Sequence, residues 1–429
     1  MWRRAAELEA PSWLRRLARL RYAVPLTPLG LVVALLSLWV VRELAPRSTD
    51  LVLHAAGLIG LLLVATAALN VLAVTAVLAV QLRRSRGTTY DLTLESGVRA
   101  TTGFSYPRFA KWPMVQVRLE WAEPRQVEVS VAFGGGRVEE LVTPRERGSF
   151  TSVQRRFLVR DIFGLTRCAL HRSAAQQVRI LPGRATASAH VTTQFASADG
   201  LSHPGGRPVG ELLDMRGYGY GDPLRHVLWK AFARTRQLLV RTPERALLPS
   251  PSAAAFFVAG ADDEASASLA RLFIEDGLLG HDFLFATDQA QQPATRPAEA
   301  LTLLVGSVRA RRHGAERLEA FLQRTNQQRG RSCLLFVPST PGPWLRRVAL
   351  LAPSLVGATV VLGLDGELSP TRTGPLAKLL FAETNPLRRR LAQVPALVTR
   401  LQRCGLRVRV IHRPSGELVP LTKLEALAQ

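Results

Sequence analysis

Apolar residues dominate two long runs near the start of the chain. Residues 25–41 carry no charge over 17 positions, and residues 51–82 carry none over 32 positions. A spanning helix needs about 20 apolar residues, so the first run is at the lower limit and the second exceeds it. With about nine residues between the runs, the pattern predicts a two-helix transmembrane hairpin over 25–86. No small-residue cleavage site follows a short apolar core, which argues against a signal peptide.

The hydrophobic pattern changes to strand-like alternation after the second run. Five segments combine β-branched and aromatic residues at strand spacing, and two of them, VQVRLEW and VEVSVAF, alternate strictly: residues 90–94, 114–121, 126–133, 155–161 and 176–182. Alternation of this kind is typical of strands with one solvated face. Gly134–Gly136 is followed by neither GK[ST] nor a helix, which favours a hairpin turn over a phosphate loop. We expect a β-rich domain over 87–190, an antiparallel β-sandwich or barrel of about seven strands.

Short, continuously apolar runs alternate with helical patterns in the last part of the chain. The runs are residues 253–260, 281–288, 332–339, 358–366 and 406–412. Amphipathic stretches separate them, at residues 264–279, 314–328 and 385–404. This order predicts a doubly wound α/β domain with a parallel sheet over 246–429. None of the loops after these strands carries a phosphate-binding, nucleophile-elbow or metal-ligand motif.

A glycine-rich aromatic segment, GYGYGDPLRHVLWKAFAR, lies between the two patterns, within a connector at 191–245. Asp222 followed by Pro223 is a typical helix start. One apolar face follows, formed by Leu224, Val227, Leu228, Ala231 and Phe232. Arg225 and Trp229 lie one turn apart, which allows a guanidinium to stack on the indole. With a strand expected at 237–242, the segment is predicted to be a turn–helix–strand joint between the two domains.

The charge of the chain indicates an anionic neighbour. Its formal net charge is +23, nearly all of it from arginine, which fits a lipid surface, nucleic acid or an acidic protein. Arginines cluster before the first apolar run and after the second, whereas the loop between the runs is balanced. The positive-inside rule therefore predicts that both termini and the soluble domains face the cytoplasm. The amphipathic N-terminus, residues 1–24, is expected to lie on the membrane through Trp13, Arg15, Arg16 and Arg19.

The cysteines agree with a reducing compartment. Cys168, Cys333 and Cys404 form no close pair, which excludes a sequence-evident disulfide scaffold or zinc cage. Arginines are spread through every segment without a nucleic-acid reader motif, so nucleic acid ranks last among the candidate partners.

Residues 210–242 resemble the signature of the domain of unknown function 58 family. The family pattern is G-E, R-x-Y-x-x-G-D, and R-x-I-x-W-x-x-x-A-R. The matching positions are Gly210, Glu211, Arg216, Tyr218, Gly221, Asp222, Arg225, Trp229, Ala233 and Arg234, with Val227 in place of the family's Ile. The upstream RDIFGL (160–165) is similar to the family's D-P-F-G-L, with Ile162 in place of Pro. The order of spans, β-rich domain and α/β domain also fits the family, so the resemblance covers nearly the whole chain.

This resemblance implies a von Willebrand factor A-like C-terminal domain, and partnership with a MoxR-type AAA+ ATPase and other membrane-complex proteins. Many von Willebrand factor A domains bind a divalent cation through D-x-S-x-S after the first strand. Here the chain reads ADDEASAS and lacks that motif. Asp262, Asp263 and Ser266, with Asp288 or Asp365 from later loops, are the candidate ligands. The more economical interpretation is that Asp262, Asp263 or Ser266 caps the following helix, so we expect no metal site.

Two interpretations of the signature residues stand side by side. Asp222 with Arg216 or Arg225 forms a structural ion pair, or the Arg/Tyr/Trp cluster forms a docking surface for a partner. One carboxylate without a paired acid, nucleophile or base does not indicate catalysis. We therefore expect a membrane-anchored scaffold without enzyme activity, cofactor or small-molecule substrate. The alternatives are a metal-assisted hydrolase using the acidic loops of the α/β domain and, ranked lower, a polyanion-binding protein.

Overall fold

The computed structural model describes residues 25–44, 51–84, 91–109, 112, 114–186, 188, 208–219, 227–245, 253–326, 332–355, 357–366 and 392–428. Side chains are described over the same ranges except 208–216, 241–245 and 426–428. The chain divides into two compact units, Met1–Leu181 and Pro182–Gln429. Each unit is taken by itself below.

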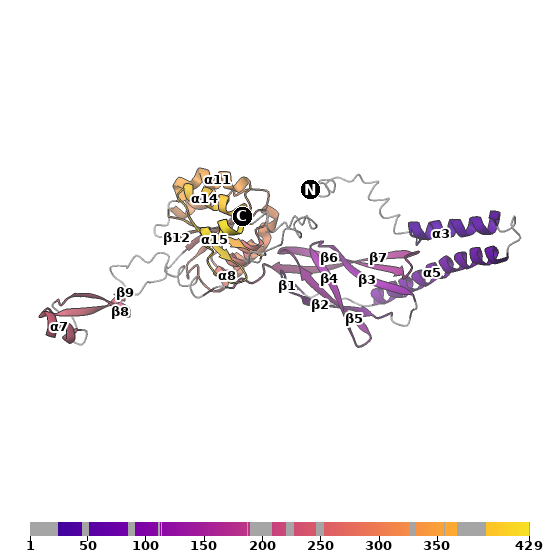
Figure 1. The fold of residues 1–429 in the computed structure, drawn as a ribbon, viewed down its shortest axis with the longest axis horizontal. Helices are drawn as coiled ribbons and strands as arrows, with labels where there is room; N and C mark the ends of the chain where they lie inside the picture. The colour runs from indigo at the N-terminus through magenta and orange to yellow at the C-terminus, as the bar shows by residue number, and fades with distance from the viewer. Residues whose placement is uncertain are drawn as a thin grey trace. The chain divides into compact units, whose positions relative to one another are not determined.

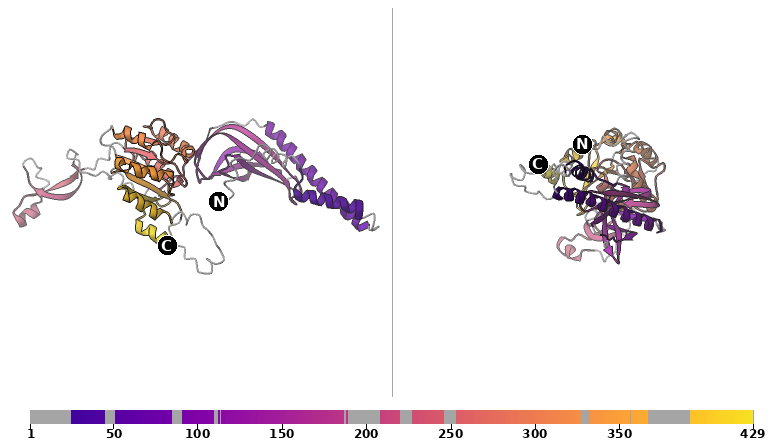
Figure 2. Two further views of the ribbon diagram at one scale, coloured as in Figure 1. Left: turned by 90° about the horizontal axis from the view of Figure 1, so that it is seen from above. Right: turned by 90° about the vertical axis from the view of Figure 1, so that its right-hand side faces the viewer.

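The first unit begins with two packed apolar helices. They are α3 (Pro28–Trp39), continued by a π-helical turn η1 (Val40–Leu44), and α5 (Leu51–Arg84). Thr27 starts α3 because its Oγ1 accepts the N–H of Gly30 at 3.1 Å and Pro28 follows it. Gly60 lies so close to Ser37 that a Cβ there would be 2.2 Å from the Ser37 hydroxyl. Small residues thus allow the two helices to pack closely, side by side in both views (Figures 1 and 2).

The long helix α5 has two different surroundings along its length. Its first part carries exposed leucines and isoleucine, including Leu58, Ile59 and Leu62. One face of its second part, formed by Val71, Val74, Leu78 and Leu82, is buried in a hydrophobic cluster with the β-strands. The sequence pattern predicted one apolar segment and did not separate these halves. Hydropathy is high in both because a protein core and a bilayer select the same side chains.

Seven strands form two sheets after α5. One sheet has the order β1-β7-β6-β3 and the other β2-β5-β4. The bounds are β1 Leu92–Glu95, β2 Ala100–Pro107, β3 Val115–Glu123, β4 Val127–Gly134, β5 Arg137–Pro144, β6 Gly148–Asp161 and β7 Arg167–Leu181. The pairs are antiparallel as expected, except that β1 pairs with β7 in parallel. The parallel pair corrects the expectation of a wholly antiparallel sheet, since strand direction depends on how the chain returns.

The two sheets share their core. Leu119 and Phe157 of one sheet pack in a cluster with Tyr106 and Val138 of the other. Burial, and secondarily the nearby Glu140 carboxylate, raises the pKa of the Tyr106 phenol to about 12. The phenol therefore stays neutral in the core at physiological pH.

The second unit contains the expected five-stranded parallel sheet, in the order β11-β10-β12-β13-β14. The strands are β10 Ala253–Phe257, β11 Leu284–Thr287, β12 Ser332–Val337, β13 Thr359–Leu364 and β14 Arg407–His412. All five coincide with predicted strands. The helices are α8 Glu264–Glu275, α9 Pro297–Gly306, η3 Ser307–Ala310, α10 Leu318–Asn326, α11 Pro343–Leu351, η4 Ala352–Leu355, α14 Val394–Arg403 and α15 Leu421–Ala428.

Helices cover both faces of this sheet (Figures 1 and 2). Successive residues of β10 alternate between the two faces: Phe256 packs with α10, α11 and α14, whereas Phe257 packs with α8 and α9. Strands buried on both faces read as continuous apolar runs, which is why the sequence pattern identified them.

The α/β unit begins before the signature segment. Ala185 packs in its core, and Thr186 hydrogen-bonds to Arg413. The signature residues follow later, in a separate two-stranded sheet of β8 (Pro208–Gly217) and β9 (Leu239–Arg245), with the short helix α7 (Trp229–Thr235) between them. The boundary between units therefore lies at 181/182 rather than within the predicted connector 191–245. The segment is an excursion inside the second unit's chain.

Candidate functional site

The loops after β10 and β12 meet at one edge of the parallel sheet. Numbered within the sheet, the strand order is 2-1-3-4-5, which places a topological switch point between β10 and β12. Ligands of such sheets bind in the crevice at this point, outside the carboxyl ends of the strands. Here the two loops are joined directly: Thr340 Oγ1 donates to the carbonyl of Ala261 at 2.7 Å, and Ser339 Oγ donates to that of Asp262 at 3.2 Å.

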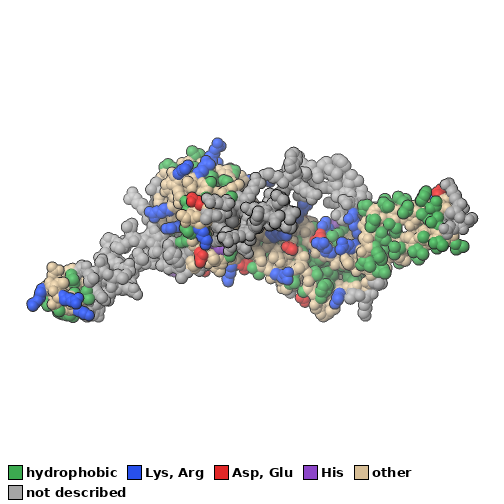
Figure 3. Space-filling view, in the orientation of Figure 1, with side chains coloured by type: hydrophobic (Ala, Val, Ile, Leu, Met, Phe, Trp, Pro, Cys, Tyr) green, Lys and Arg blue, Asp and Glu red, His purple; other side chains and the backbone are tan. Residues whose placement is uncertain are grey.

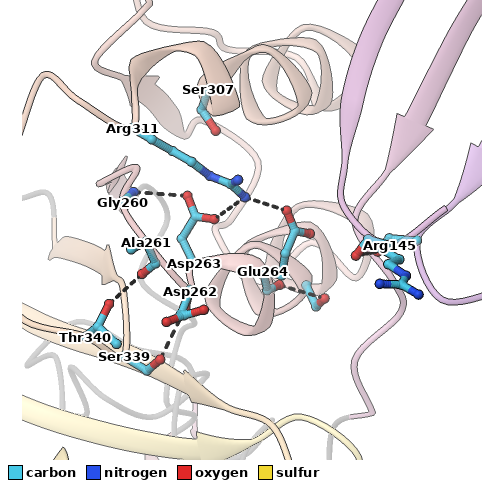
Figure 4. Close-up of polar contacts among 12 residues, drawn as sticks. Arg145, Gly260, Ala261, Asp262, Asp263, Glu264, Ser307, Arg311, Ser339 and Thr340 are labelled. Atoms are coloured by element: carbon cyan, nitrogen blue, oxygen red, sulfur yellow. Dashed lines mark hydrogen bonds and ion pairs between the residues drawn. The ribbon is translucent and has the colours of Figure 1, made fainter. Parts of the chain in front are cut away.

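An arginine holds the acidic residues of this edge. The guanidinium of Arg311 donates to Asp263 Oδ1 at 2.8 Å and to Glu264 Oε1 at 3.0 Å (Figure 4). The other oxygen of Asp263 accepts the N–H of Gly260 at 3.1 Å. The Asp263 side chain is fully buried, while that of Arg311 is 23% exposed. A cationic group that directly follows η3 thus neutralises the carboxylates at the start of α8.

The Ser266 hydroxyl is used in hydrogen bonds within the fold. Its hydroxyl donates to the carbonyl of Val337 at 2.6 Å and accepts the N–H of Gly363 at 2.9 Å. The close approach requires glycine, because a Cβ at 363 would lie 2.4 Å from the backbone carbon of Ala265. Ser266 therefore fastens the first turn of α8 onto β12 and β13 rather than pointing into the crevice.

Asp262 and Asp365 are two further candidates of the predicted set. Asp365 is paired with Arg413, whose Nε lies 2.5 Å from its Oδ1. Asp262 adopts the left-handed backbone region at φ 55° in the tight turn before α8. Asp263 precedes Glu264 as the residue flanking α8, without a side-chain hydrogen bond to the first turn. The expected capping role is therefore not seen for Asp263.

These contacts do not fit a divalent-cation site. A Mg²⁺ ion needs several free oxygen ligands in octahedral arrangement. Asp263, Ser266 and Asp365 are instead engaged by a guanidinium, two backbone groups and a second guanidinium, respectively. Among the described residues, no group of three His, Cys, Asp or Glu side chains is placed to hold a metal ion. The arrangement is an arginine–carboxylate pair at a ligand-binding position.

Asp288, the remaining acidic candidate, serves the loop before α10. Its carboxylate accepts the N–H groups of Ala315 at 2.8 Å and Arg317 at 3.2 Å. Burial raises the pKa of Asp288, although these two hydrogen bonds work in the opposite direction. The residue is structural.

Two cavities of the α/β unit lack paired carboxylates among the described residues that line them. One, of about 630 Å³, lies by β14, α14 and α15 and contains Glu417 as its acidic residue. The other, of about 140 Å³, lies between β11 and α10 and is lined by Arg317 and Arg324 beside apolar residues.

The structure describes the signature residues only in part. Gly221, Asp222 and Arg225 lie outside the described residues, and Gly210, Glu211 and Arg216 are described as backbone within β8. The described residues correct the predicted helix, because α7 begins at Trp229 with Leu228 before it, and Val227 bridges Val240. Strand pairing by Val227 replaces the helical turn that its spacing suggested.

The described aromatic residues of the signature are solvent-exposed. Trp229 is 57% exposed and packs edge-on against Phe232, with ring centroids 6.3 Å apart. Tyr218 is 36% exposed, and Arg234 is also exposed. The Trp229 indole is therefore not part of a folding core among the described residues.

Apolar side chains cover the surface of α3 and the first part of α5. Figure 3 shows them as a continuous green zone, and they include Leu31, Val32, Leu35, Leu36, Trp39, Leu58, Ile59, Leu62 and Leu69. Within the described residues, α5 is the helix long and apolar enough to cross a membrane. The predicted interfacial residues Trp13, Arg15, Arg16 and Arg19 lie outside the described residues.

Sequence reasoning missed the most informative residue of the site. Arg311 lies 47 positions after Glu264 and carries no local motif, so only the fold brings it to α8. Gly363 left a weak signal, a glycine inside an otherwise apolar strand, which is typical of close backbone approach.

Comparisons with known proteins add no family assignment. A scan against protein-family models gives no matching model, and a search of curated proteins gives no match.

Proposed function

We propose that the chain is a membrane-anchored cytoplasmic scaffold that binds protein partners through its α/β unit. The observation that carries the proposal is the Arg311 guanidinium, which takes the position between Asp263 and Glu264 at the switch-point edge. A site neutralised by a resident cation has no need of a divalent metal, and the Arg311 side chain, 23% exposed, adds positive charge to a surface that would contact an acidic partner.

The anchor is the helix pair α3 and α5, in the membrane of a bacterial cell. Large apolar side chains are exposed on both helices (Figure 3). Contact with water is unfavourable for a patch of this kind, whereas lipid acyl chains would cover it. The arginines outside the apolar runs favour a two-pass arrangement with both soluble units on the cytoplasmic side.

The partner class comes from the resemblance of residues 210–242 to the domain of unknown function 58 family. That resemblance, and the von Willebrand factor A-like order of strands and helices that it implies, favours a MoxR-type AAA+ ATPase. Two surfaces are candidates for docking: the Arg311 edge and the exposed Trp229 of α7.

Binding to reconstituted protein tests the scaffold function. The full chain is placed in lipid nanodiscs, and binding of a MoxR-type ATPase from the same organism is measured by biolayer interferometry. Wild type and Arg312→Ala should bind alike, because Arg312 is exposed and its substitution removes the same charge next to Arg311 without touching the pairs of Arg311 with Asp263 and Glu264. Arg311→Ala should weaken binding at least tenfold. Equal binding by all three proteins would remove the Arg311 edge from the interface.

Calorimetry separates the scaffold from a metal-assisted hydrolase. Titration of the nanodisc protein with Mg²⁺ or Mn²⁺ should give no binding isotherm at millimolar concentrations, and ester or phosphoester substrates should not be hydrolysed. A clear isotherm together with divalent-dependent turnover would replace the scaffold by the hydrolase.

Cysteine labelling tests the two-pass orientation. Ser48→Cys lies in the loop between the apolar runs, and Val98→Cys lies in the β-rich part. A membrane-impermeant maleimide should label the first in intact spheroplasts and the second only after permeabilisation. The reverse result would invert the proposed topology.

A further inference from the structure

The turn between β6 and β7 presents large apolar side chains to solvent. Ile162 is 52% exposed and Phe163 is 48% exposed. Met114, just before β3, is 54% exposed and its carbonyl accepts the N–H of Ile162 at 3.0 Å. Three large apolar residues from two segments thus meet at one end of the sheet, and we refer to them as the apolar tip.

The turn is held in this shape by a buried carboxylate. Asp161 accepts the N–H of Phe163 at 2.8 Å, the N–H of Leu165 at 3.2 Å and the Oγ1 hydroxyl of Thr166 at 2.7 Å. Burial of Asp161 works to raise its pKa, but these hydrogen bonds lower it below the usual value. Gly164 supplies the left-handed residue of the turn, at φ 72°. The hydrogen bonds of Asp161 and the conformation of Gly164 therefore fix the turn that exposes Ile162 and Phe163.

The same turn is joined to the first turn of α3. Thr27 donates its N–H to the carbonyl of Leu165 at 2.9 Å and its hydroxyl to that of Gly164 at 2.6 Å. Arg167 donates its N–H to the carbonyl of Pro25 at 2.8 Å. Gly30 lies against Leu165, where a Cβ would be 2.0 Å from the carbonyl oxygen. The β6–β7 turn therefore lies beside the first turn of α3, at the same position along the axis of this helix (Figure 1).

We propose that Met114, Ile162 and Phe163 insert into the lipid interface beside the helix pair, as a third membrane contact of the β-rich unit. The proposal rests on the anchor of the proposed function, because it follows from the level at which α3 would enter the bilayer. Apolar side chains at that level meet acyl chains or the headgroup boundary rather than water. Arg160, exposed directly before the turn, is placed for anionic headgroups.

A third contact changes what the anchor does. Because α5 packs against the β-strands, the helix pair and the two sheets tilt in the bilayer as one body. A fixed contact by the turn, joined by hydrogen bonds to α3, holds the two sheets at one orientation to the membrane. The lipid surface then takes part in presenting the protein to its partners.

Collision accessibility of nitroxide labels tests the insertion. The full chain, with Cys168, Cys333 and Cys404 replaced by Ala, is labelled at Phe163→Cys, Val98→Cys or Leu62→Cys in nanodiscs of phosphatidylcholine and phosphatidylglycerol. Val98 is 49% exposed and follows Ser96, which pairs with Leu181 at the opposite end of β7. The 15 residues of β7 separate positions 98 and 163 by about 50 Å. Leu62, 63% exposed on α5, reports the anchor.

The expected result is a ratio of oxygen to aqueous nickel-complex accessibility that is several-fold higher at 163 than at 98, and close to that at 62. Ile162→Asp should lower the ratio at 163 towards the aqueous value, and Val98→Asp should leave it unchanged. A lipid-like label at 62 with an aqueous label at 163 overturns the insertion and leaves the anchor intact.

Two other outcomes also decide against the insertion. Aqueous labels at both 62 and 163 overturn the anchor together with the apolar tip. A label at 163 that is shielded from both reagents identifies a protein contact there, such as a second copy of the chain, instead of lipid.

Discussion

Each unit contains an arginine paired with a buried carboxylate, and the two pairs differ in how they meet solvent. In the β-rich unit, Arg155 donates to Glu140 at 2.8 Å, and both side chains are almost fully buried, at 3% and 0% exposed. In the α/β unit, Arg311 is 23% exposed although its partner Asp263 is fully buried. The same chemical pair therefore lies inside one unit and at the edge of the other.

The buried pair of the β-rich unit belongs to a closed network. Glu140 also accepts the indole N–H of Trp121 at 2.7 Å and the hydroxyl of Thr102. The Arg155 guanidinium lies over the ring of Phe104, 4.4 Å from its centroid. These residues come from β2 and β5 of one sheet and from β3 and β6 of the other, so the network links the two sheets.

The difference between the pairs indicates different roles. A network with all its partners inside the protein can only specify the fold. An arginine at the switch point whose side chain is partly exposed can also contribute to a ligand or partner contact. The predictions below test this contrast, beginning with the largest effect.

Removal of the Glu140 carboxylate should destabilise the protein most. Glu140→Ala leaves Arg155 as an unpaired buried charge, which costs about 3–5 kcal/mol. Urea unfolding of the β-rich unit, followed by Trp fluorescence, measures the change. Glu128→Ala is the control, since its pair with Arg145 at 3.4 Å is exposed and contributes below about 1 kcal/mol. Similar losses for both variants would contradict the closed network.

Arg311→Ala should have a smaller effect on stability and a larger one on partner binding. Asp263 then stays buried without its guanidinium, at a cost of about 2 kcal/mol, which is reduced by solvent access at the edge. Arg311→Lys should recover part of the stability but less of the binding, because lysine cannot replace two directed N–H groups. Thermal melting and biolayer interferometry of the same variants measure the two effects. A large loss of stability with unchanged binding would assign Arg311 to the fold, like Arg155.

Asp161→Asn should change the pH dependence of stability. The pKa of Asp161 is lower in the folded protein than its ordinary value of about 3.9. Its contribution is therefore present above about pH 4 and is lost as the pH falls through the folded-state pKa. At pH 7 the variant should be about 1–2 kcal/mol less stable, and the gap should close on acidification. A gap that is constant between pH 7 and pH 2 would contradict the ionised role of the carboxylate.

Trp229→Ala should have the smallest effect on folding. The indole is 57% exposed, so the melting temperature should change by less than the equivalent of about 0.5 kcal/mol. Binding of the ATPase should nevertheless weaken if α7 is part of the interface. Lys230→Ala, on the same helix, is the matched control. Loss of folded protein on Trp229→Ala would instead place the indole in a structural contact.

The hydrophobic pattern predicted the strands that are buried on both faces and those that are solvated on one face. The runs at 253–260 and 358–366 predicted β10 and β13 because a strand buried on both faces must be apolar throughout. Strict alternation predicted β3 and β4 for the complementary reason, a single solvated face. The long apolar run 51–82 also identified a helix, but hydropathy alone did not reveal that its second half packs against the sheets.

Only the tertiary structure decided how distant residues are paired. The parallel pairing of β1 with β7, the clamp of Arg311 on Asp263 and the entry of the chain into the α/β unit at 182 each join positions far apart in the sequence. The acidic run at 262–264 therefore suggested a helix cap, with cation ligands as the alternative, while the fold placed a guanidinium there. Local propensity and hydrophobic period act over a few residues, whereas the partner of a charge is selected by the packing of the whole unit.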